Sequence, residues 1–392
     1  MLSVPLAPKV TSLGALDPQR RLFDALIPLP EGTSYNSYLV QGSEKTALID
    51  TVDAAMPEVL LANLDAMGIK NLDYVIANHA EQDHSGALPR VLAKYPQAKV
   101  VTNPKCKDFL IDLLHIDADK FITVADGEKL SLGDKTLEFI YAPWVHWPET
   151  MLTYLAEDKL LFSCDFFGAH WADNGPVQDE KRAYLAAKRY FAEIMQPFRN
   201  NILQHLKKLN DKQISIIAPS HGPIHLRPEF ILKAYLEWSG DKPANKVLIP
   251  FVSMHGSTAS LVKTLEEFLA EKGVTVKTFD LTTVDLGELA MELVEAATMV
   301  LATPCVLAGI HPAAAYAAYL TRALRPKLKY ASIIGSYGWA QKVPEQVVSL
   351  LTGLNVEILP PVMVKGLPRE NDLLEIRKLG EIIVEKHKGL NS

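Results

Sequence analysis

The segment Asn78-His79-Ala80-Glu81-Gln82-Asp83-His84-Ser85-Gly86 restricts what this chain can fold into more than any other feature. It follows a short apolar run, residues 74–78, that predicts a buried strand. Two carboxylates and two imidazoles packed at the end of such a strand make electrostatic sense if cations lie among them. On a loop, alternate side chains point to one side, so His79, Glu81 and Asp83 can converge. His84 is the most constrained of the four, because the adjacent Asp83 limits its reach.

Three further candidate ligands occupy equivalent places in the sequence. Each lies just past the carboxyl end of a predicted strand: His146 after residues 136–142, Asp165 after 159–164 and His221 after 214–218. Open sheets gather ligands at that edge. With the first cluster they give four histidines and three carboxylates, a set suited to two metal ions. Asp165 comes from a strand of its own, which suits a bridging position.

Each of these three residues also has a purely structural interpretation. His146 stands between Trp144 and Trp147 and could belong to an aromatic cluster. Asp165 could cap a helix, and His221 could serve a turn before Gly222. The cluster from His79 to His84 has no comparable alternative, and we therefore favour the metal hypothesis for all seven residues.

The first part of the chain, residues 1–242, predicts an α+β domain. Its further expected strands are 35–40 and 46–52, paired around a polar turn at 42–45. Its expected helices are 57–67, which stops before Gly68, and 182–195 and 201–209. The run Ser-Gly-Asp-Lys-Pro-Ala-Asn at 239–245 has the composition of a linker.

Residues 243–392 then alternate regularly between strand and helix patterns. The expected strands are 246–252, 274–280, 298–302, 330–334 and 356–359, and the expected helices are 260–272, 286–296, 313–325, 344–352 and 370–387. This alternation predicts a doubly wound α/β domain with a parallel sheet.

Three segments at strand ends of this second domain predict a flavin site. The first, Ser253-Met254-His255-Gly256-Ser257-Thr258, opens a helix, where backbone N–H groups and hydroxyls can cradle a phosphate. The others are Thr303-Pro304-Cys305 and Gly335-Ser336-Tyr337-Gly338-Trp339. Both leave the same edge of the sheet, so they can flank one ligand, and Trp339 could stack on an isoalloxazine ring. The structural alternatives are an ordinary strand–helix turn and a surface tryptophan.

Composition narrows the class further. A net charge of −6 argues against nucleic acid or an anionic membrane surface as the main partner. Three separated cysteines, Cys106, Cys164 and Cys305, make no C-x-x-C pair and argue against a cysteine-ligated metal. We see no signal peptide and no stretch long enough to span a bilayer, and we expect a cytoplasmic protein.

The metal pattern resembles that of the metallo-β-lactamase superfamily, H-x-H-x-D-H followed by a distant His, Asp and His. Here Glu81 replaces the second His, and H-x-E-x-D-H is the mark of the flavodiiron proteins, also called A-type flavoproteins. The anionic ligand set favours iron that cycles between two oxidation states over hydrolytic zinc. The segments Gly32-Thr33-Ser34-Tyr35-Asn36-Ser37-Tyr38-Leu39 and His146-Trp147-Pro148-Glu149, and the S-x-x-G-S-T form of the phosphate loop, support the same resemblance.

This resemblance covers the whole chain and implies a fold, cofactors and roles. It implies a metallo-β-lactamase-like αββα sandwich followed by a flavodoxin-like sheet. One iron is expected on His79, Glu81 and His146, and the other on Asp83, His84 and His221, with Asp165 as the bridge. FMN is expected on the three segments of the second domain. His170, five residues past Asp165, is a candidate donor of a hydrogen bond or proton, or else a packing histidine beside Trp171.

The same resemblance implies partners and a reaction. Dioxygen would be reduced to water, nitric oxide to nitrous oxide, or both. No rubredoxin-type cysteines or flavin-reductase domain follow, so we expect a separate electron donor such as rubredoxin or a flavin- or NADH-dependent reductase. A homodimer or homotetramer is expected, in which the flavin of one subunit faces the irons of the other.

Two other functions stay open at this point. A dizinc hydrolase with a flavodoxin-like module would act without electrons, and Glu81 argues against it. A non-catalytic FMN carrier would have lost metal ligands, and the complete set argues against that. The chain also departs from the family at Cys305, where polar residues are more usual, and at Asp24 and Ala25, where many members carry a histidine.

Overall fold

The computed structural model describes residues 3–339 and 342–390 and divides the chain into two compact units. One comprises Met1–Phe191 and Phe198–Ser239, and the other comprises Ala192–Pro197 and Gly240–Ser392. The units meet along the chain at Ser239 and Gly240, close to the expected boundary after residue 242. Among the described helices, none combines the length and apolarity needed to span a bilayer.

The N-terminal unit is a sandwich of two sheets. In spatial order the first sheet contains β1 (Val4–Ala7), β2 (Val10–Ser12), β7 (Tyr38–Gln41), β8 (Thr46–Ile49), β9 (Tyr74–Ile76), β10 (Lys99–Thr102) and β11 (Phe121–Thr123). The second contains β12 (Lys129–Ser131), β13 (Thr136–Tyr141), β14 (Met151–Leu155), β15 (Leu160–Cys164) and β16 (Ile216–Pro219). Two short ribbons pair β3 (Ala15–Asp17) with β6 (Thr33–Tyr35) and β4 (Leu22–Phe23) with β5 (Ile27–Pro28).

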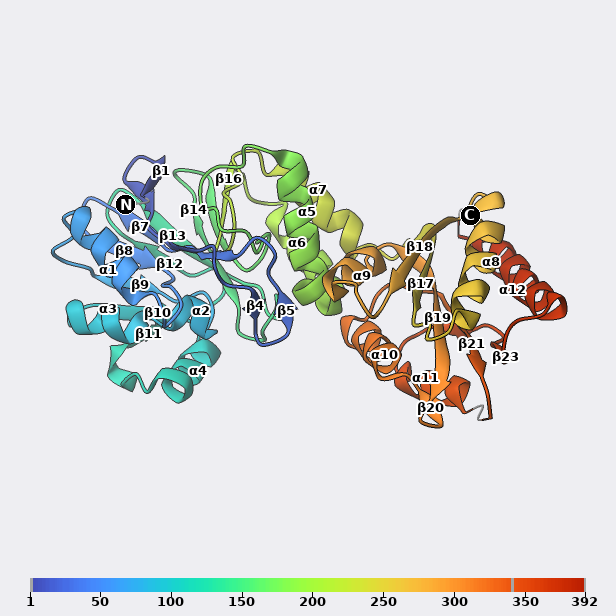
Figure 1. Cartoon of the computed structure of the whole chain (residues 1–392). Coiled ribbons are helices and arrows are strands. Elements are labelled where there is room, and N and C mark those ends of the chain that lie inside the picture. The colour runs from blue at the N-terminus through green and yellow to red at the C-terminus, as the bar shows by residue number, and fades with distance from the viewer. Residues whose placement is uncertain (1–2, 340–341, 391–392) are drawn as a thin grey trace. The chain divides into compact units, whose positions relative to one another are not determined.

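Helices cover both outer faces of this sandwich (Figure 1). They are α1 (Pro57–Ala66), α2 (Gln82–Ser85), α3 (Leu88–Lys94), α4 (Pro104–Leu114), α5 (Glu180–Tyr190), α6 (Arg199–Leu209) and α7 (Glu229–Ser239). One apolar core, with Leu48, Leu60 and Val91, fills the space under α1, α3 and α4. A second core, with Ile49, Phe139 and Phe162, lies between the sheets. The expected αββα fold is confirmed.

Strand direction explains why the candidate ligands meet. In the first sheet β8, β9 and β10 run parallel, so the segments that follow them leave the same edge. In the second sheet β15 and β16 run parallel, and β13 points the same way because β14 is antiparallel to both β13 and β15. The segments after β9, β13, β15 and β16 therefore carry all seven expected ligands.

The C-terminal unit is the expected doubly wound sheet. Its strands are, in spatial order, β18 (Thr275–Asp280), β17 (Ala244–Phe251), β19 (Ala296–Val306), β21 (Tyr330–Tyr337) and β22 (Glu357–Ile358), with β20 (Gly309–Ile310) paired to β19 and β23 (Val362–Lys365) to β21. Numbered along the chain, the main path has the order 2-1-3-4-5. That order is the flavodoxin-like arrangement, which binds its ligand between the first and third strands.

Helices cover both faces of this second sheet as well (Figure 1). One face carries α8 (Ser257–Glu271) and α12 (Glu370–Lys388), and the other carries α9 (Leu286–Leu293), α10 (Pro312–Leu324) and α11 (Val343–Leu350). Strand β19 is buried from Ala296 to Pro304. A parallel strand covered on both faces has no solvent side, so its sequence is a continuous apolar run.

Three local predictions were wrong, and several strands were not expected. The expected strand 35–40 is broken at Asn36. The backbone N–H of Asn36 donates a hydrogen bond to the carbonyl of Ser220 and not to a neighbouring strand. The expected helix 182–195 ends as α5 at Tyr190 and continues as a π-helix over Phe191–Met195. Thr303, Pro304 and Cys305 are not a loop but extend β19, which pairs with β21 as far as Pro304 opposite Ser336 and then turns into β20. Strand β23 was not expected at all.

Candidate metal centre and flavin site

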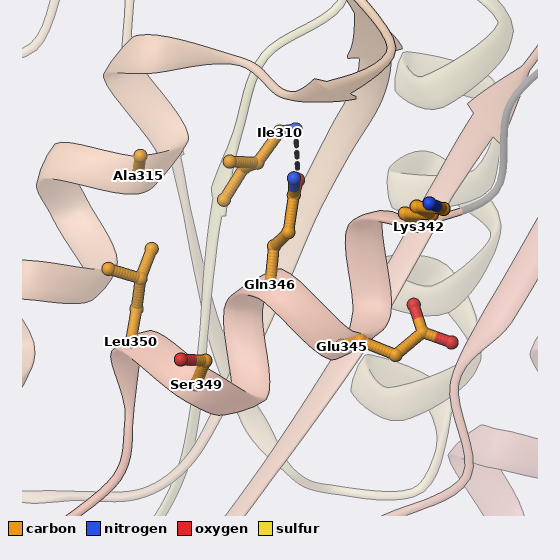
Figure 2. Close-up of a pocket in the computed structure, with 7 residues that line it drawn as sticks. All are labelled: Ile310, Ala315, Lys342, Glu345, Gln346, Ser349 and Leu350. Carbon is orange, nitrogen blue, oxygen red and sulfur yellow. Dashed lines mark hydrogen bonds between the residues drawn. The ribbon is translucent and has the colours of Figure 1, made fainter.

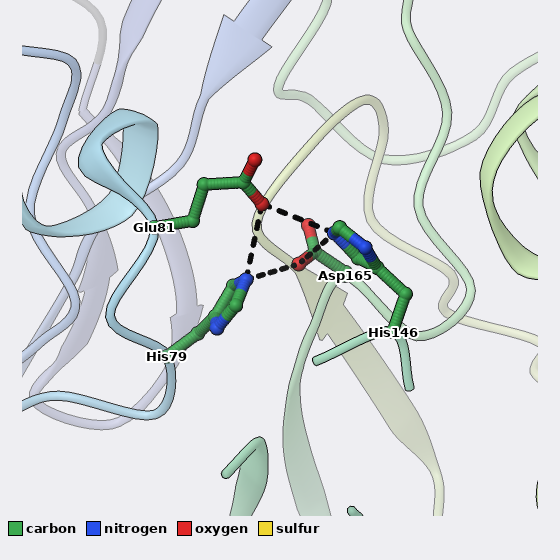
Figure 3. A group of neighbouring side chains, drawn as sticks. All are labelled: His79, Glu81, His146 and Asp165. Atoms are coloured by element: carbon green, nitrogen blue, oxygen red, sulfur yellow. Dashed lines mark hydrogen bonds and ion pairs between the residues drawn. The ribbon is translucent and has the colours of Figure 1, made fainter. Parts of the chain in front are cut away.

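The first group of ligands gathers around one oxygen of Asp165 (Figure 3). Glu81 Oε2 lies 3.1 Å from His79 Nε2 and 3.0 Å from His146 Nε2. Asp165 Oδ2 lies 3.5 Å from His79 Nε2 and 3.7 Å from His146 Nε2. The two imidazole nitrogens and two carboxylate oxygens thus surround one point, as ligands of a single cation would.

The second group gathers around the other oxygen of the same carboxylate. His84 Nε2 lies 3.0 Å from Asp165 Oδ1 and 3.3 Å from Asp83 Oδ1. His221 Nε2 lies 2.9 Å from Asp83 Oδ2 and 3.4 Å from Asp165 Oδ1. Each oxygen of Asp165 therefore faces a different triad, which is the geometry of a carboxylate that bridges two cations.

His84 reaches this group because its segment is not a simple loop. Gln82–Ser85 forms the short helix α2, so Asp83 and His84 project from one helical turn instead of alternating along an extended chain. The expectation that alternate residues of a loop converge was wrong for Asp83. The helical turn places the Asp83 carboxylate and the His84 imidazole side by side.

The residues present fit two cations. Both oxygens of Asp83 and both nitrogens of His84 are buried, and none of them makes a hydrogen bond. Such atoms are normally paired, and cations bound among them would satisfy all four. Burial lowers the pKa of His84, but the Asp165 and Asp83 carboxylates outweigh it and raise the pKa to about 10. Without metal, protons on His79 and His84 therefore offset part of the carboxylate charge.

Outer contacts orient three of the ligands. His79 Nδ1 lies 2.6 Å from Glu149 Oε1, which also accepts a hydrogen bond from Ala80 N at 3.1 Å. His221 Nδ1 donates to the carbonyl of Ser34 at 2.6 Å. Tyr190 Oη donates to Asp165 Oδ1 at 2.8 Å. The acceptors on His79 and His221 fix the ring orientation and raise the basicity of the ligand, whereas the Tyr190 hydroxyl holds the Asp165 carboxylate in place. Glu149 was noted only as part of a motif, and Tyr190 was missed, because neither carries a local signal of its contact.

His170 lies beside the second group. Its ring centroid is 5.0 Å from that of His221 and 4.8 Å from that of Tyr190. Nδ1 lies 3.0 Å from Thr33 Oγ1, whereas Nε2 is buried without a hydrogen bond. Burial, reinforced by His221, holds the pKa of His170 well below its usual range. The imidazole is therefore neutral and keeps one ring nitrogen free.

A cavity of about 250 Å³ opens over the ligands. Its lining residues are Arg20, Phe23, Asp24, Asp53, Glu81, Gln82, Asp83, Leu113 and Trp147. Arg20 is held by Asp53 at 3.0 Å and by Tyr35 Oη at 2.7 Å. Burial, together with Glu81 and Asp83, raises the pKa of Asp24. The cavity is large enough for a diatomic molecule and several waters, and too small for a bulky substrate.

The three segments expected to hold a flavin meet at one cavity of about 170 Å³ in the C-terminal unit. It is lined by Ser253, Met254, His255, Ser257, Thr258, Pro304, Cys305, Ser336, Tyr337, Gly338 and Gly366. Thr258 Oγ1 and Ser336 Oγ lie 3.1 Å apart, which joins the first and third segments. Gly366 follows β23 and was missed together with that strand.

Four residues of the three segments are not among those lining residues, and one of them, Gly335, lies within β21 opposite Thr303. Gly256 has a φ of +85° and precedes α8, so it shapes the turn. Thr303 is buried in β19 and donates to Pro304 O. Trp339 is 80% exposed, which leaves its ring free to cover a ligand or a partner.

A larger surface hollow of about 710 Å³ lies in the same unit (Figure 2). Its lining residues are Ile310, Ala315, Lys342, Glu345, Gln346, Ser349 and Leu350. The Gln346 side chain accepts a hydrogen bond from Ile310 N at 2.8 Å and so ties β20 to α11. None of the expected site residues lines this hollow, so its size alone does not make it the site.

A metallo-β-lactamase-like domain with ligand groups for two cations, followed by a flavodoxin-like domain, is the organisation of a flavin-dependent redox enzyme. Comparisons with known proteins agree. Residues 33–222 match the family described as ODP family beta lactamase. A type A flavoprotein of Rhodobacter capsulatus is 34% identical and covers 98% of this chain and 92% of its own length. A nitric oxide reductase of Moorella thermoacetica is also 34% identical, and the match covers 95% of this chain and 96% of that protein.

Solved structures extend the match to the whole fold. The rubredoxin oxygen:oxidoreductase of Desulfovibrio gigas superposes with a TM-score of 0.95 at 29% identity, with full coverage of both chains. The flavodiiron protein of Giardia intestinalis gives 0.93 at 26% identity, covering 100% of this chain and 98% of its own. The chain belongs to the flavodiiron, or type A flavoprotein, family. Members of this family are oxidoreductases that carry FMN and a diiron centre.

Proposed function

We propose that this chain reduces dioxygen to water, nitric oxide to nitrous oxide, or both. One dioxygen takes four electrons and four protons to give two waters. Two nitric oxide molecules take two electrons and two protons to give nitrous oxide and one water. The observation that carries the proposal is Asp165, a single buried carboxylate whose oxygens face two separate ligand triads. The names of the relatives, nitric oxide reductase and rubredoxin-oxygen oxidoreductase, support both substrates.

In this proposal His79, Glu81 and His146 hold one iron, Asp83, His84 and His221 hold the other, and Asp165 bridges them. Three carboxylates give the site a hard, anionic ligand set that suits iron in both oxidation states. When bound, two neighbouring irons supply electrons to a diatomic oxidant in the cavity above them.

The side chains around the metal ligands then hold those ligands in place and move protons. Glu149 and the Ser34 carbonyl fix the rings of His79 and His221, so the ligands need little rearrangement. Tyr190 holds the bridging carboxylate through its Oδ1 atom. His170, neutral and with Nε2 free in either tautomer, is assigned to hold or move a proton beside the second triad. Phe23, Leu113 and Trp147 supply the apolar part of a cavity lining that is otherwise polar.

Electrons enter through FMN, whose phosphate we assign to the segment 253–258 before α8. Ser253 Oγ accepts from Ala259 N at 3.2 Å, which closes the turn at the N-terminus of α8, where backbone N–H groups can bind a phosphate. The donor is a separate protein such as rubredoxin or a flavin- or NADH-dependent reductase. We further propose a cytoplasmic homodimer or homotetramer.

The decisive experiment measures metals and turnover together. The protein is loaded anaerobically with Fe²⁺ and FMN and analysed for iron and zinc. Reduced protein is then mixed with dioxygen or nitric oxide. We expect two irons per chain and consumption of at least one oxidant. Asp165→Asn should lose both the full iron content and the consumption of the oxidant. Asp126→Asn, which removes a carboxylate from an exposed ion pair with Lys208, should leave both unchanged. Two firmly bound zincs without oxidant consumption would contradict the proposal and favour the hydrolase.

A further inference from the structure

A series of aromatic side chains extends from Asp165 to helices α5 and α7 of the N-terminal unit. Tyr190 begins the series, because its Oη donates to Asp165 Oδ1 at 2.8 Å. Tyr184, which is half-buried on α5, ends it. The rings between these two are at most 2% exposed: Phe191, Tyr235 and Trp238.

Ring contacts connect the two ends of this series. Phe191 follows Tyr190 in the chain, and its ring centroid lies 5.3 Å from that of Trp238. Tyr235 packs against both rings, at 5.3 Å from Phe191 and 5.3 Å from Trp238. Trp238 then contacts Tyr184 at 5.1 Å, and its Nε1 donates to Tyr184 Oη at 3.0 Å. The rings thus lead from a buried carboxylate to a partly exposed phenol.

Packing alone does not call for phenol and indole rings here. Phenylalanine fills a core without a polar atom, whereas a buried tyrosine or tryptophan needs a hydrogen-bond partner. Phenol and indole differ from phenylalanine in chemistry as well, because they lose one electron far more readily to a strong oxidant. A reduced flavin is a much stronger reductant than a phenol, so this series does not belong to the normal supply of electrons.

We propose that Trp238 and Tyr184 form the outer end of a path that gives electrons to the metal centre when the flavin cannot, and that this path protects the metal ligands from oxidation. The proposal rests on the proposed function, because it requires dioxygen to react at the site. It concerns a state that normal turnover avoids.

The electron count defines that state. Reduction of one dioxygen to two waters takes four electrons and four protons, and two ferrous ions supply only two electrons. Without reduced flavin, the two missing electrons come from phenol and indole rings, each of which loses one electron and one proton. Tyr184 passes its electron inward through Trp238 and releases its phenolic proton to water, which leaves a neutral tyrosyl radical at the exposed end.

The full chain loaded with Fe²⁺ but not with FMN tests this proposal. The protein is loaded anaerobically, mixed with dioxygen and freeze-quenched, and EPR spectroscopy detects any radical. Growth on ring-deuterated tyrosine narrows the signal if a tyrosine carries it. Hydrogen peroxide is measured in the same mixtures, because dioxygen that receives only two electrons and two protons leaves as hydrogen peroxide.

We expect a tyrosyl radical in wild type that is lost in Tyr184→Phe and in Trp238→Phe, with more hydrogen peroxide released by both variants. Prior reduction of FMN-loaded protein should abolish the radical, and both variants should then reduce dioxygen as wild type does. Tyr141→Phe is the control and should keep the radical. Tyr141 is also half-buried, and its hydroxyl donates to the Val124 carbonyl, outside the series.

Three results would overturn the proposal. The first is a wild-type protein that consumes dioxygen without FMN and forms no radical. The second is a radical of wild-type amplitude in either Tyr184→Phe or Trp238→Phe. The third is an equal loss of the radical in Tyr141→Phe. If wild type binds no iron or consumes no dioxygen, the proposed function fails instead, so the two failures are distinguishable.

Damage to the ligands is a second readout. With dioxygen in excess over the reductant, mass spectrometry follows oxidation of the peptides that carry His79, His84 and His146. Faster oxidation in Tyr184→Phe than in Tyr141→Phe would support protection, and equal rates would overturn it. Tyr184→Phe removes a single hydroxyl, so it keeps the test open if Trp238→Phe does not fold, which thermal melting of the metal-free proteins checks.

Discussion

Single residues around Asp165 decide how strongly this chain can hold two cations. Glu149 is one of them, although its place in the sequence gives no sign of this role. Its Oε1 lies 2.6 Å from His79 Nδ1 and accepts from Ala80 N, so one buried carboxylate fixes both the ring and the backbone of a ligand. Carboxylate–histidine–metal arrangements of this kind are common because the carboxylate sets the tautomer of the ring.

We expect Glu149→Gln to weaken Fe²⁺ binding about 10- to 100-fold. The amide oxygen can keep both contacts of Oε1, but it is a weaker acceptor than a carboxylate, and the negative charge beside His79 is lost. Chelator competition measures the change. Glu128→Gln, whose side chain also accepts from a backbone N–H but in an exposed turn, should bind metal as wild type does. Equal affinities for the two variants would show that the Glu149 contact does not matter.

Protonation of the imidazoles predicts how metal binding depends on pH. Carboxylates raise the pKa of His84 to about 10 and that of His79 well above its ordinary value, in both cases against the effect of burial. Below those pKa values the metal-free rings carry protons, and a ligating imidazole must lose one. Metal should therefore release protons at pH 7 to 8, and affinity should rise as the pH is raised.

Calorimetry of Zn²⁺ binding in two buffers with different ionisation heats checks this expectation. The difference between the observed heats gives the number of protons released. We expect a clear release in wild type and a smaller one in His84→Ala, because that variant lacks one of the protonated rings. Heats that do not depend on the buffer would contradict the expectation.

At the scale of elements, the turn that opens α8 is the part most open to test. Gly256 has a φ of +85° and no atom near the position of a Cβ, so an alanine there meets strain but no clash. Gly273, after the same helix, has a φ of +76° and equally open space. Both substitutions should destabilise the fold by about 1–2 kcal/mol, the cost of a left-handed non-glycine residue.

Only Gly256→Ala should also weaken the binding of FMN. A residue that relaxes out of the left-handed region redirects the N–H groups of the segment 253–258, whereas Gly273 lies a full helix away. FMN titration followed by fluorescence quenching measures the binding, and urea unfolding measures the stability. The assignment of this segment to the phosphate would be wrong if both variants bound FMN with the wild-type affinity.

Elements also show where the sequence was sufficient. Alternation of strands and helices predicted the parallel sheet of the second unit, and strand ends predicted the seven side chains that gather in groups able to hold a metal, because both signals are local. What was missed is long-range. Tyr190 and Ser34 reach the site only through pairing and packing of distant segments, and the extension of β19 depends on its register with β21 as far as Pro304 and with β20 at Cys305.

At the scale of the whole molecule, the question is which chain's flavin serves which chain's metals. The proposed homodimer places the FMN of one protomer against the metal centre of its partner. Exposed apolar side chains near the flavin cavity are consistent with a covered surface: Met254, Leu307, Trp339 and Leu367. In a two-fold dimer such an arrangement creates two equivalent composite sites.

Pairing two inactive chains separates this arrangement from transfer within one chain. Asp165→Asn removes the bridge between the metals, and Ser257→Asp places a negative charge where the flavin phosphate is expected. Co-expression with two different affinity tags isolates the heterodimer. One of its composite sites joins an intact flavin segment to an intact metal centre, and the other joins two damaged ones. We expect about half of the wild-type turnover from the heterodimer and almost none from either homodimer. If electrons instead pass within each chain, the heterodimer is inactive, because one chain lacks the metal bridge and the other lacks the flavin. An inactive heterodimer that still binds FMN and iron at its intact sites would therefore contradict transfer between protomers.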